Sequence, residues 1–161
     1  MKIKIKYHNP NCKITQFGDW IDVRAAETVT LHAPCTRKSS KVHFEDALIS
    51  LGFSMELPMY FEANLVPRSS TFGQFHVIQA NHMGVIDYTY AGNNDIWKVK
   101  VIAFDDTVIK ETDRIGQFRI RPTQDAPIWV KLKWLFTSKI EFVEVDNLEK
   151  SDRGGFGSTN K

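Results

Sequence analysis

Cysteine is scarce in this chain, with only Cys12 and Cys35 among 161 residues. Two cysteines are too few for the disulfide framework of a small secreted domain, which favours a reducing, intracellular setting. An excess of charge of one sign is also lacking, because 21 basic and 19 acidic residues leave a net charge of +2. That balance gives no electrostatic reason to expect nucleic acid or an anionic membrane as a partner.

Long apolar runs are absent as well, and none approaches the ~20 residues that a membrane-spanning helix requires. The first residues alternate lysine with isoleucine and lack the apolar stretch of a signal peptide, so we expect none. Hydrophobic residues make up 42% of the sequence and charged residues 25%, which is typical of a globular domain and not of a disordered chain. The length suits one domain with a sizeable core.

Period-two alternation of apolar and polar residues is the main structural signal, and turn residues separate the alternating runs. Many short strands of this kind predict an all-β barrel or sandwich. Only Phe44–Leu51 has a pattern that fits a helix, and it is short enough to be a strand instead. The expected strands are Lys2–Tyr7, Ile21–Ala25, Thr28–Leu31, Leu51–Leu57, Phe61–Val66, Trp97–Phe104, Ile115–Ile120 and Ile140–Val145.

Three segments differ from the main β domain, which we expect to cover residues 1–148. Pro34–His43 is polar and basic, which is typical of a surface loop. Thr123–Ser138 is rich in Trp, Leu and Phe, and we expect an extra strand or hairpin that packs on the barrel; a partner-binding surface is the alternative. Residues 149–161 hold three of the nine glycines, and we expect a flexible arm that closes over a ligand.

The composition of this arm suits a phosphate-bearing ligand. The glycines of Gly154–Gly157 allow positive φ, so that backbone N–H groups can converge on an anion. Arg153 adds a guanidinium, and Ser158 and Thr159 add hydroxyl donors. Phe156 has little of its own to pack on between glycines, so stacking on a ligand ring is its expected role. The alternative is a chain end with no fixed structure.

Other clusters suggest chemistry less strongly. Pro67–Ser70 offers an arginine and two hydroxyls to a polyphosphate, although serine here also suits a helix N-cap. In Asn81–Gly92, Asp87 lies among apolar neighbours and could activate a water, whereas a turn aspartate bonds its own backbone. Asp22 could hold the water shell of a metal, or simply be a solvated carboxylate. Gln117 could donate to a phosphate, or satisfy a backbone group.

In this order, the clusters resemble the homotrimeric dUTPase (dUTP pyrophosphatase) family, in the branch carried by phages and prophages of Gram-positive bacteria. The matching motifs are PRSS at Pro67–Ser70, GVIDYTY at Gly84–Tyr90, DRIGQ at Asp113–Gln117 and RGGFGST at Arg153–Thr159. The resemblance implies a β-clip, a distorted jelly-roll-like subunit that forms a threefold homotrimer. It also implies pockets built from three chains, with the motif of Asp87 and the arm supplied by different subunits.

The resemblance further implies the hydrolysis of dUTP to dUMP and pyrophosphate, which limits uracil incorporation into DNA and supplies dUMP for thymidylate synthesis. Asp87 would be the catalytic base, and Mg2+ would be anchored through water by Asp22. The host cytoplasm would be the location if the chain is phage-encoded. The residues implied to bind substrate are Arg68, Ser69, Ser70, Asn81, Gly84, Val85, Ile86, Tyr90, Gln117, Arg153, Phe156, Gly157, Ser158 and Thr159.

Two other functions are compatible with this fold. The first is a phage regulatory protein that binds a repressor, with Thr123–Ser138 as the contact surface and catalysis secondary. The second is a dCTP deaminase, which is disfavoured by Tyr90 and Phe156 in their dUTPase-like contexts. An intact Asp87, Tyr90 and Arg153 favour the hydrolase over the regulator.

Overall fold

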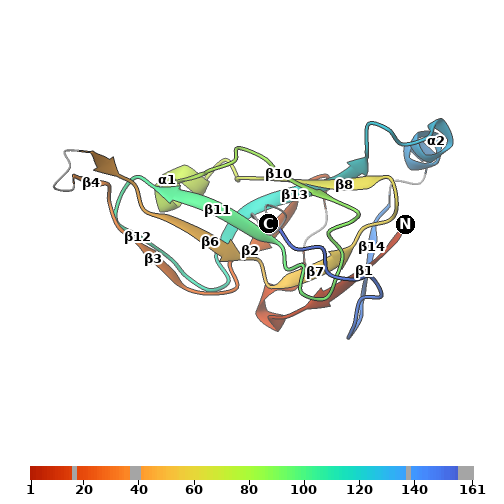
Figure 1. The fold of residues 1–161 in the computed structure, drawn as a ribbon, viewed down its shortest axis with the longest axis horizontal. Coiled ribbons are helices and arrows are strands. Elements are labelled where there is room, and N and C mark those ends of the chain that lie inside the picture. The colour runs from red at the N-terminus through yellow and green to blue at the C-terminus, as the bar shows by residue number, and fades with distance from the viewer. Residues whose placement is uncertain (16–17, 37–40, 137–138, 156–161) are drawn as a thin grey trace.

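The protein is described here by a computed structural model that covers residues 1–15, 18–36, 41–136 and 139–155. Strands dominate, and Figure 1 shows them gathered into an elongated body. In chain order the strands are β1 (Lys2–Tyr7), β2 (Ile21–Arg24), β3 (Val29–Leu31), β4 (Cys35–Thr36), β5 (Val42–His43), β6 (Asp46–Ser50), β7 (Phe53–Glu56), β8 (Phe61–Val66), β9 (Val77–Gln79), β10 (Gly84–Asp87), β11 (Lys98–Ala103), β12 (Thr107–Ile109), β13 (Arg114–Pro122) and β14 (Glu141–Glu144). The helices are η1 (Pro10–Cys12), α1 (Thr71–Phe75) and α2 (Ile128–Phe136). The expected all-β architecture is confirmed.

The core is a layer of aliphatic and aromatic side chains between sheets. In β1, Ile3 and Ile5 are fully buried while the alternating Lys2, Lys4 and Lys6 are more exposed, as the period of a strand requires. At the centre, the ring of Trp97 lies 5.2 Å from that of Phe53 and 5.1 Å from that of Phe118, centroid to centroid. All three side chains are buried, so they fix the sheets against one another.

One sheet, with the strand order β10-β8-β13-β2, carries most of the motifs found in the sequence. All three pairings are antiparallel, and the register sets Asp87 opposite Glu62 at the beginning of β8. Gln117 lies opposite Val66 at the end of β8 and opposite Asp22 of β2. The register therefore places Asp87 and Asp22 in different regions of the sheet.

Most sequence-based strand predictions are confirmed, with ends shifted by one or two residues. Phe44–Leu51 forms the strand β6 and no helix. The surface position expected for Pro34–His43 is confirmed at its described residues, since β4 and β5 are exposed and pair with each other at one end of the molecule (Figure 1). Residues 37–40 lie outside the described residues.

The prediction of a strand or hairpin within Thr123–Ser138 is wrong, because Ile128–Phe136 forms the helix α2. Amide donation from Val130 to the carbonyl of Pro127 closes the first turn. Val130 and Trp134, spaced four residues apart on one face of the helix, pack against the core. No helix in the described part of the chain is long and apolar enough to cross a membrane.

Candidate active site

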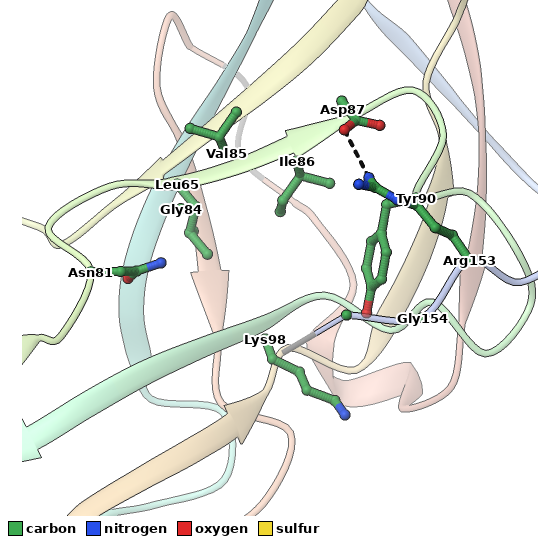
Figure 2. A pocket seen from close by; sticks show the side chains of 11 residues that line it. Leu65, Asn81, Gly84, Val85, Ile86, Asp87, Tyr90, Lys98, Arg153 and Gly154 are labelled. Carbon is green, nitrogen blue, oxygen red and sulfur yellow. Dashed lines mark hydrogen bonds and ion pairs between the residues drawn. The ribbon is translucent and has the colours of Figure 1, made fainter. Parts of the chain in front are cut away.

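A pocket of about 290 Å³ lies beside β10, close to the lower size limit of small-molecule sites. Figure 2 shows Asn81 at one end of the pocket, and Asp87, Tyr90 and Arg153 together at the other. The arm thus contributes to the same pocket as the strand of Asp87. The lining residues are Leu65, Asn81, Gly84, Val85, Ile86, Asp87, Tyr90, Lys98, Arg153, Gly154 and Gly155.

Asp87 ends β10, and its two carboxylate oxygens have different partners. Oδ1 accepts hydrogen bonds from the backbone N–H of Thr89, at 2.7 Å, and from the Thr89 hydroxyl. Oδ2 accepts from the guanidinium of Arg153 at 2.8 Å. Burial raises the pKa of Asp87, but the bonds from Thr89 and the charge of Arg153 outweigh it and lower the pKa below its usual value. The group is therefore a carboxylate at neutral pH.

The wall of the pocket comes from the backbone of β10. β10 is at the edge of its sheet among the described strands, so the N–H and C=O groups on its outer side are open to a ligand. A Cβ on Gly84 would lie 3.3 Å from Cβ of Leu65, so glycine permits the close approach of β10 to β8. Asn81 accepts a hydrogen bond from the Gln79 side chain at 3.1 Å, which orients its amide beside this edge.

Tyr90 forms the side of the pocket next to the arm. Its hydroxyl donates to the carbonyl of Ile96 at 3.1 Å, which holds the ring in place. Burial raises the pKa of this hydroxyl, and the nearby carboxylates of Asp95 and Asp152 raise it further, so the ring remains neutral. The ring lies close against Gly155, since a Cβ there would be 3.2 Å from Cε2 of Tyr90.

A second cluster groups the residues expected to bind phosphate or metal. Arg68 donates from Nε to Oδ1 of Asp22 at 2.9 Å, and Arg114 donates to Oδ2 at 3.1 Å. Gln117 donates to the carbonyl of Pro67 at 3.2 Å, so it satisfies a backbone group, as its alternative interpretation predicts. The structure thus brings Arg68, Asp22 and Gln117 together, and adds Arg114, which was not among the predicted site residues.

The remaining predicted residues divide into two groups. Ser69 and Ser70 follow Arg68 and lead into α1, where Ser70 occupies the N-cap position without a side-chain capping bond. Ser69 lines a hollow together with Arg68 of the second cluster, and neither serine lines the pocket of Asp87. The other group, Phe156, Gly157, Ser158 and Thr159, lies outside the described residues.

Sequence reasoning missed the residues that hold the arm in place. Asp95 is 1% exposed and accepts hydrogen bonds from the backbone N–H groups of Arg153 and Gly154, both at 2.8 Å. Asn94 donates to Asp152 from its backbone and from its side chain. The run of polar residues after Gly92 resembles an ordinary turn, so nothing local reveals these distant partners.

Comparison with known proteins gives a consistent result. No protein-family model matches the chain. The SPbeta prophage-derived deoxyuridine 5′-triphosphate nucleotidohydrolase YosS of Bacillus subtilis is 45% identical over 162 residues, covering 99% of this chain and 98% of that protein. The deoxyuridine 5′-triphosphate nucleotidohydrolase of Hydrogenobaculum is 32% identical over 120 residues, covering 72% of each chain.

Solved structures share the fold. The dUTPase of Streptococcus mutans superposes with a TM-score of 0.62 at 18% identity, covering 75% of this chain and 93% of that one. The D95N mutant of the dUTPase from Staphylococcus aureus phage phi11, whose structure reveals the coordination of a structural Mg(II) ion, superposes with a TM-score of 0.60 at 17% identity, covering 78% of this chain and 93% of that one. This likeness confirms the β-clip, jelly-roll-like fold that the motifs predict.

Proposed function

The chain belongs to the deoxyuridine 5′-triphosphate nucleotidohydrolase (dUTPase) family and hydrolyses dUTP to dUMP and pyrophosphate, and we propose that it does so in the pocket beside β10 with Asp87 as the base. The observation that carries this proposal is the convergence of Asp87, Tyr90 and Arg153 on one pocket. A base, a sugar-contacting ring and a cation for phosphate are the groups that this reaction requires.

Asp87 would hold and deprotonate the water that attacks the α-phosphorus. Its lowered pKa keeps it ionised, so it can accept a proton from a bound water. Oδ1 is oriented by Thr89, whereas Oδ2 faces only the guanidinium of Arg153 in the described structure. When a substrate phosphate attracts Arg153, Oδ2 becomes free to accept from the water. Binding of the triphosphate would in this way release the base.

The edge of β10 would select uracil. Uracil presents one donor, N3–H, between two carbonyl acceptors, and this pattern complements a strand edge with alternating C=O and N–H groups. Cytosine exchanges a donor and an acceptor on that edge, which would leave buried polar groups unpaired. The close packing of Gly84 on Leu65 would leave no space for the methyl group of thymine. Tyr90 would lie beneath the deoxyribose, where it would clash with a 2′-hydroxyl.

The second cluster supports a substrate site completed by another subunit. Asp87 and Gln117 face opposite ends of β8, so they lie roughly 13 Å apart along the strand and roughly 10 Å apart across the sheet. A triphosphate whose α-phosphorus is beside Asp87 cannot reach Arg68 and Gln117 of the same chain. In the threefold homotrimer that the family resemblance implies, a neighbour's Arg68, Ser69, Ser70 and Gln117 would bind those phosphates.

An exposed aromatic group next to the second cluster fits a subunit contact. The rings of Phe44 and Phe72 lie 5.4 Å and 6.2 Å from that of Phe104. All three side chains are more than two-fifths exposed in the single chain. Contiguous apolar surface of this kind is typical of interfaces. Burial of these rings between subunits would bring the phosphate cluster of one chain to the pocket of another.

The residues fit a Mg2+ ion that arrives with the substrate. No group of three or more His, Cys, Asp or Glu side chains in the described ranges could hold a metal. Mg2+ usually keeps several waters and binds substrate phosphates with one or two carboxylates. Asp22 has acceptor sites beyond those used by Arg68 and Arg114, so it would bind a metal-bound water. The ion would neutralise charge on the phosphate oxygens.

The regulatory alternative, in which the chain binds a repressor and catalysis is secondary, is not favoured. A protein that acts only by binding does not need Asp87, Tyr90 and Arg153 to converge on one pocket.

A nucleotide panel tests the proposed site directly. Pyrophosphate release is measured with dUTP, UTP, dCTP and dTTP, with MgCl2 and after its removal with EDTA. We expect dUTP to be hydrolysed at least roughly 10²-fold faster than the others, because mismatched polar groups are strongly rejected. The rate should disappear with EDTA and return with MgCl2. Equal rates for dUTP and dCTP would contradict the role of β10, and an unchanged rate in EDTA would contradict the role of Mg2+.

A further inference from the structure

Gln79 is a buried amide that the proposed reaction does not use. It lies in β9, opposite Val101 of β11, and is 6% exposed. Its Nε2 donates to the backbone carbonyl of Leu65 and to Oδ1 of Asn81, both at 3.1 Å. Its Oε1 is buried and has no hydrogen-bond partner in the described part of the chain. An apolar side chain would avoid the cost of burying that oxygen, so the two bonds from the nitrogen are what this glutamine contributes.

The carbonyl of Leu65 fixes which way the amide of Gln79 points. A backbone carbonyl can only accept a hydrogen bond, so the nitrogen of Gln79, and not its oxygen, must face it. The second hydrogen of that nitrogen needs an acceptor, and the atom of Asn81 that meets it is therefore Oδ1. This sets Nδ2 of Asn81 away from Gln79, and Figure 2 shows that nitrogen directed toward the pocket. Through two amides, the carbonyl of Leu65 thus determines that the pocket is offered a donor.

This relay lies directly beneath the first residue of β10. Leu65 of β8 is the register partner of Gly84. A Cβ on Gly84 would lie 3.3 Å from Cβ of Leu65 and 3.7 Å from Nε2 of Gln79, so the amide of Gln79 packs against the strand edge that the base is proposed to meet. The relay is complete within residues 65–84 of one chain, and it does not depend on what neighbouring subunits contribute.

The position of Asn81 indicates which atom of uracil it meets. Asn81 lies at the end of the pocket away from Asp87 and Tyr90. The proposed function sets the deoxyribose on Tyr90 and the α-phosphorus beside Asp87, so the ring atom that is bonded to the sugar, N1, points to that end. The opposite side of the ring carries O4, which is therefore the atom nearest to Asn81. Cytosine differs from uracil at this atom, because it carries an amino group there.

We propose that Gln79 is a positioning residue for base selection, which holds the amide of Asn81 with Nδ2 toward O4 of uracil and so excludes cytosine. This proposal rests on the proposed function of the pocket. A donor on the protein matches the carbonyl of uracil, whereas it would oppose the amino group of cytosine and leave two donors unpaired. An amide that is free to turn would accept from that amino group through Oδ1 instead. Asn81 therefore discriminates between the two bases only when Gln79 orients it.

Two substitutions of Gln79 separate release of the Asn81 amide from its reversal. Gln79→Met keeps the length of the side chain without a donor, so Asn81 can turn to suit either base. We expect the ratio of kcat/KM for dUTP to that for dCTP to fall about tenfold. Glutamate brings at most one hydrogen where glutamine has two, and the carbonyl of Leu65 takes it. In Gln79→Glu the oxygen facing Asn81 then accepts from Nδ2 and turns Oδ1 to the pocket, and we expect the ratio to fall about tenfold further.

A structural role of Gln79 is measured separately. The control is Gln124→Glu, the same change at an exposed residue that does not line the pocket, and it should keep the wild-type ratio. Urea denaturation of each variant records the loss of the buried hydrogen bonds. Lower stability together with a wild-type ratio in both Gln79 variants would overturn the proposal. If Gln79→Glu fails to fold, the uncharged Gln79→Met still decides between the two roles.

A double-mutant cycle tests whether Gln79 acts through Asn81. In the Asn81→Ala background the amide to be oriented is missing, so Gln79→Met should change the ratio by less than about twofold. An equal fall in both backgrounds would overturn the relay, since Gln79 would then act on β10 directly. A wild-type protein that hydrolyses dUTP and dCTP equally would contradict the proposed site itself. A selective wild type with equally selective Gln79 variants would contradict only the role of Gln79.

Discussion

The arm and α2 are attached to the molecule in opposite ways. Residues 149–154, the described start of the arm before Gly155, have no large apolar side chain and are held by hydrogen bonds to Asp95 and Asn94. α2 consists mostly of large apolar residues, yet five of them are about half exposed or more: Ile128, Trp129, Leu132, Leu135 and Phe136. Figure 1 shows α2 standing out at one end of the molecule.

This difference indicates that buried polar groups position a segment more strictly than partly buried apolar side chains do. Apolar area stabilises only where it is removed from water, and α2 achieves this mainly through Val130 and Trp134. A buried carboxylate instead requires donors at defined positions, so Asp95 fixes particular N–H groups of the arm. Substitutions near the arm should therefore alter the reaction, whereas substitutions on α2 should alter stability or nothing.

The largest effect is expected at the carboxylate that the arm contacts. Asp87→Asn should lower kcat by ~10²–10⁴-fold, the usual contribution of a general base, and keep dUTP binding, because shape is retained. The measurement is pyrophosphate release together with nucleotide affinity by calorimetry. The control is Asp125→Asn, at an exposed acid that does not line the pocket. A variant that keeps more than about a tenth of the wild-type rate would rule out Asp87 as the base.

A smaller effect, on the choice between dUTP and UTP, is expected at Tyr90, whose ring lies next to the arm. Tyr90→Ala should lower the preference for dUTP over UTP about tenfold or more, because it removes the ring proposed to exclude the 2′-hydroxyl. Tyr90→Phe, which keeps the ring and loses only the hydrogen bond to Ile96, should retain the preference. The readout is the ratio of kcat/KM for the two nucleotides. An unchanged ratio in Tyr90→Ala would place the sugar discrimination elsewhere.

The contrast between local sequence pattern and long-range contacts also explains which parts of the fold could be predicted from the sequence. β1 and β8 are found with the predicted ends, because alternation in Lys2–Tyr7 and β-branched or apolar residues in Phe61–Val66 indicate strands locally. The prediction of a strand or hairpin at α2 was wrong, because apolar and polar residues alternate in Val130–Trp134 as they do in a strand. The helical conformation of this segment instead depends on tertiary contacts of residues spaced four apart.

The candidate site shows the same limit. The motifs pointed to Asp87 and Arg153, but not to their contact within one chain. Asp95 has no local signal, because its partners Arg153 and Gly154 are 58 and 59 residues further along the chain. A local sequence pattern can indicate which residues are suited to catalysis or binding. The polar groups that position those residues come from distant parts of the chain, so only the folded structure identifies them.

A stability effect is expected where α2 meets the core. The ring of Trp134 lies edge-on to that of Phe61, at 5.4 Å between centroids. Trp134→Ala should lower the free energy of unfolding by about 1–3 kcal/mol, less than for a fully buried tryptophan because this one is only partly buried. Urea denaturation measures the change. An unaltered midpoint would show that α2 contributes nothing to the core.

The smallest effect is expected at the two residues that follow Trp134 and lie on the exposed side of α2. Leu135 and Phe136 are 72% and 80% exposed, so the double variant Leu135→Ser, Phe136→Ser removes little buried area and should change stability by less than about 0.5 kcal/mol. The rate of dUTP hydrolysis should stay at the wild-type value, because neither residue lines the pocket beside β10. Urea denaturation, kinetics and sedimentation are compared with those of Trp134→Ala. If the double variant dissociates in sedimentation, the exposed face of α2 is a subunit contact, and its attachment depends on burial in the oligomer.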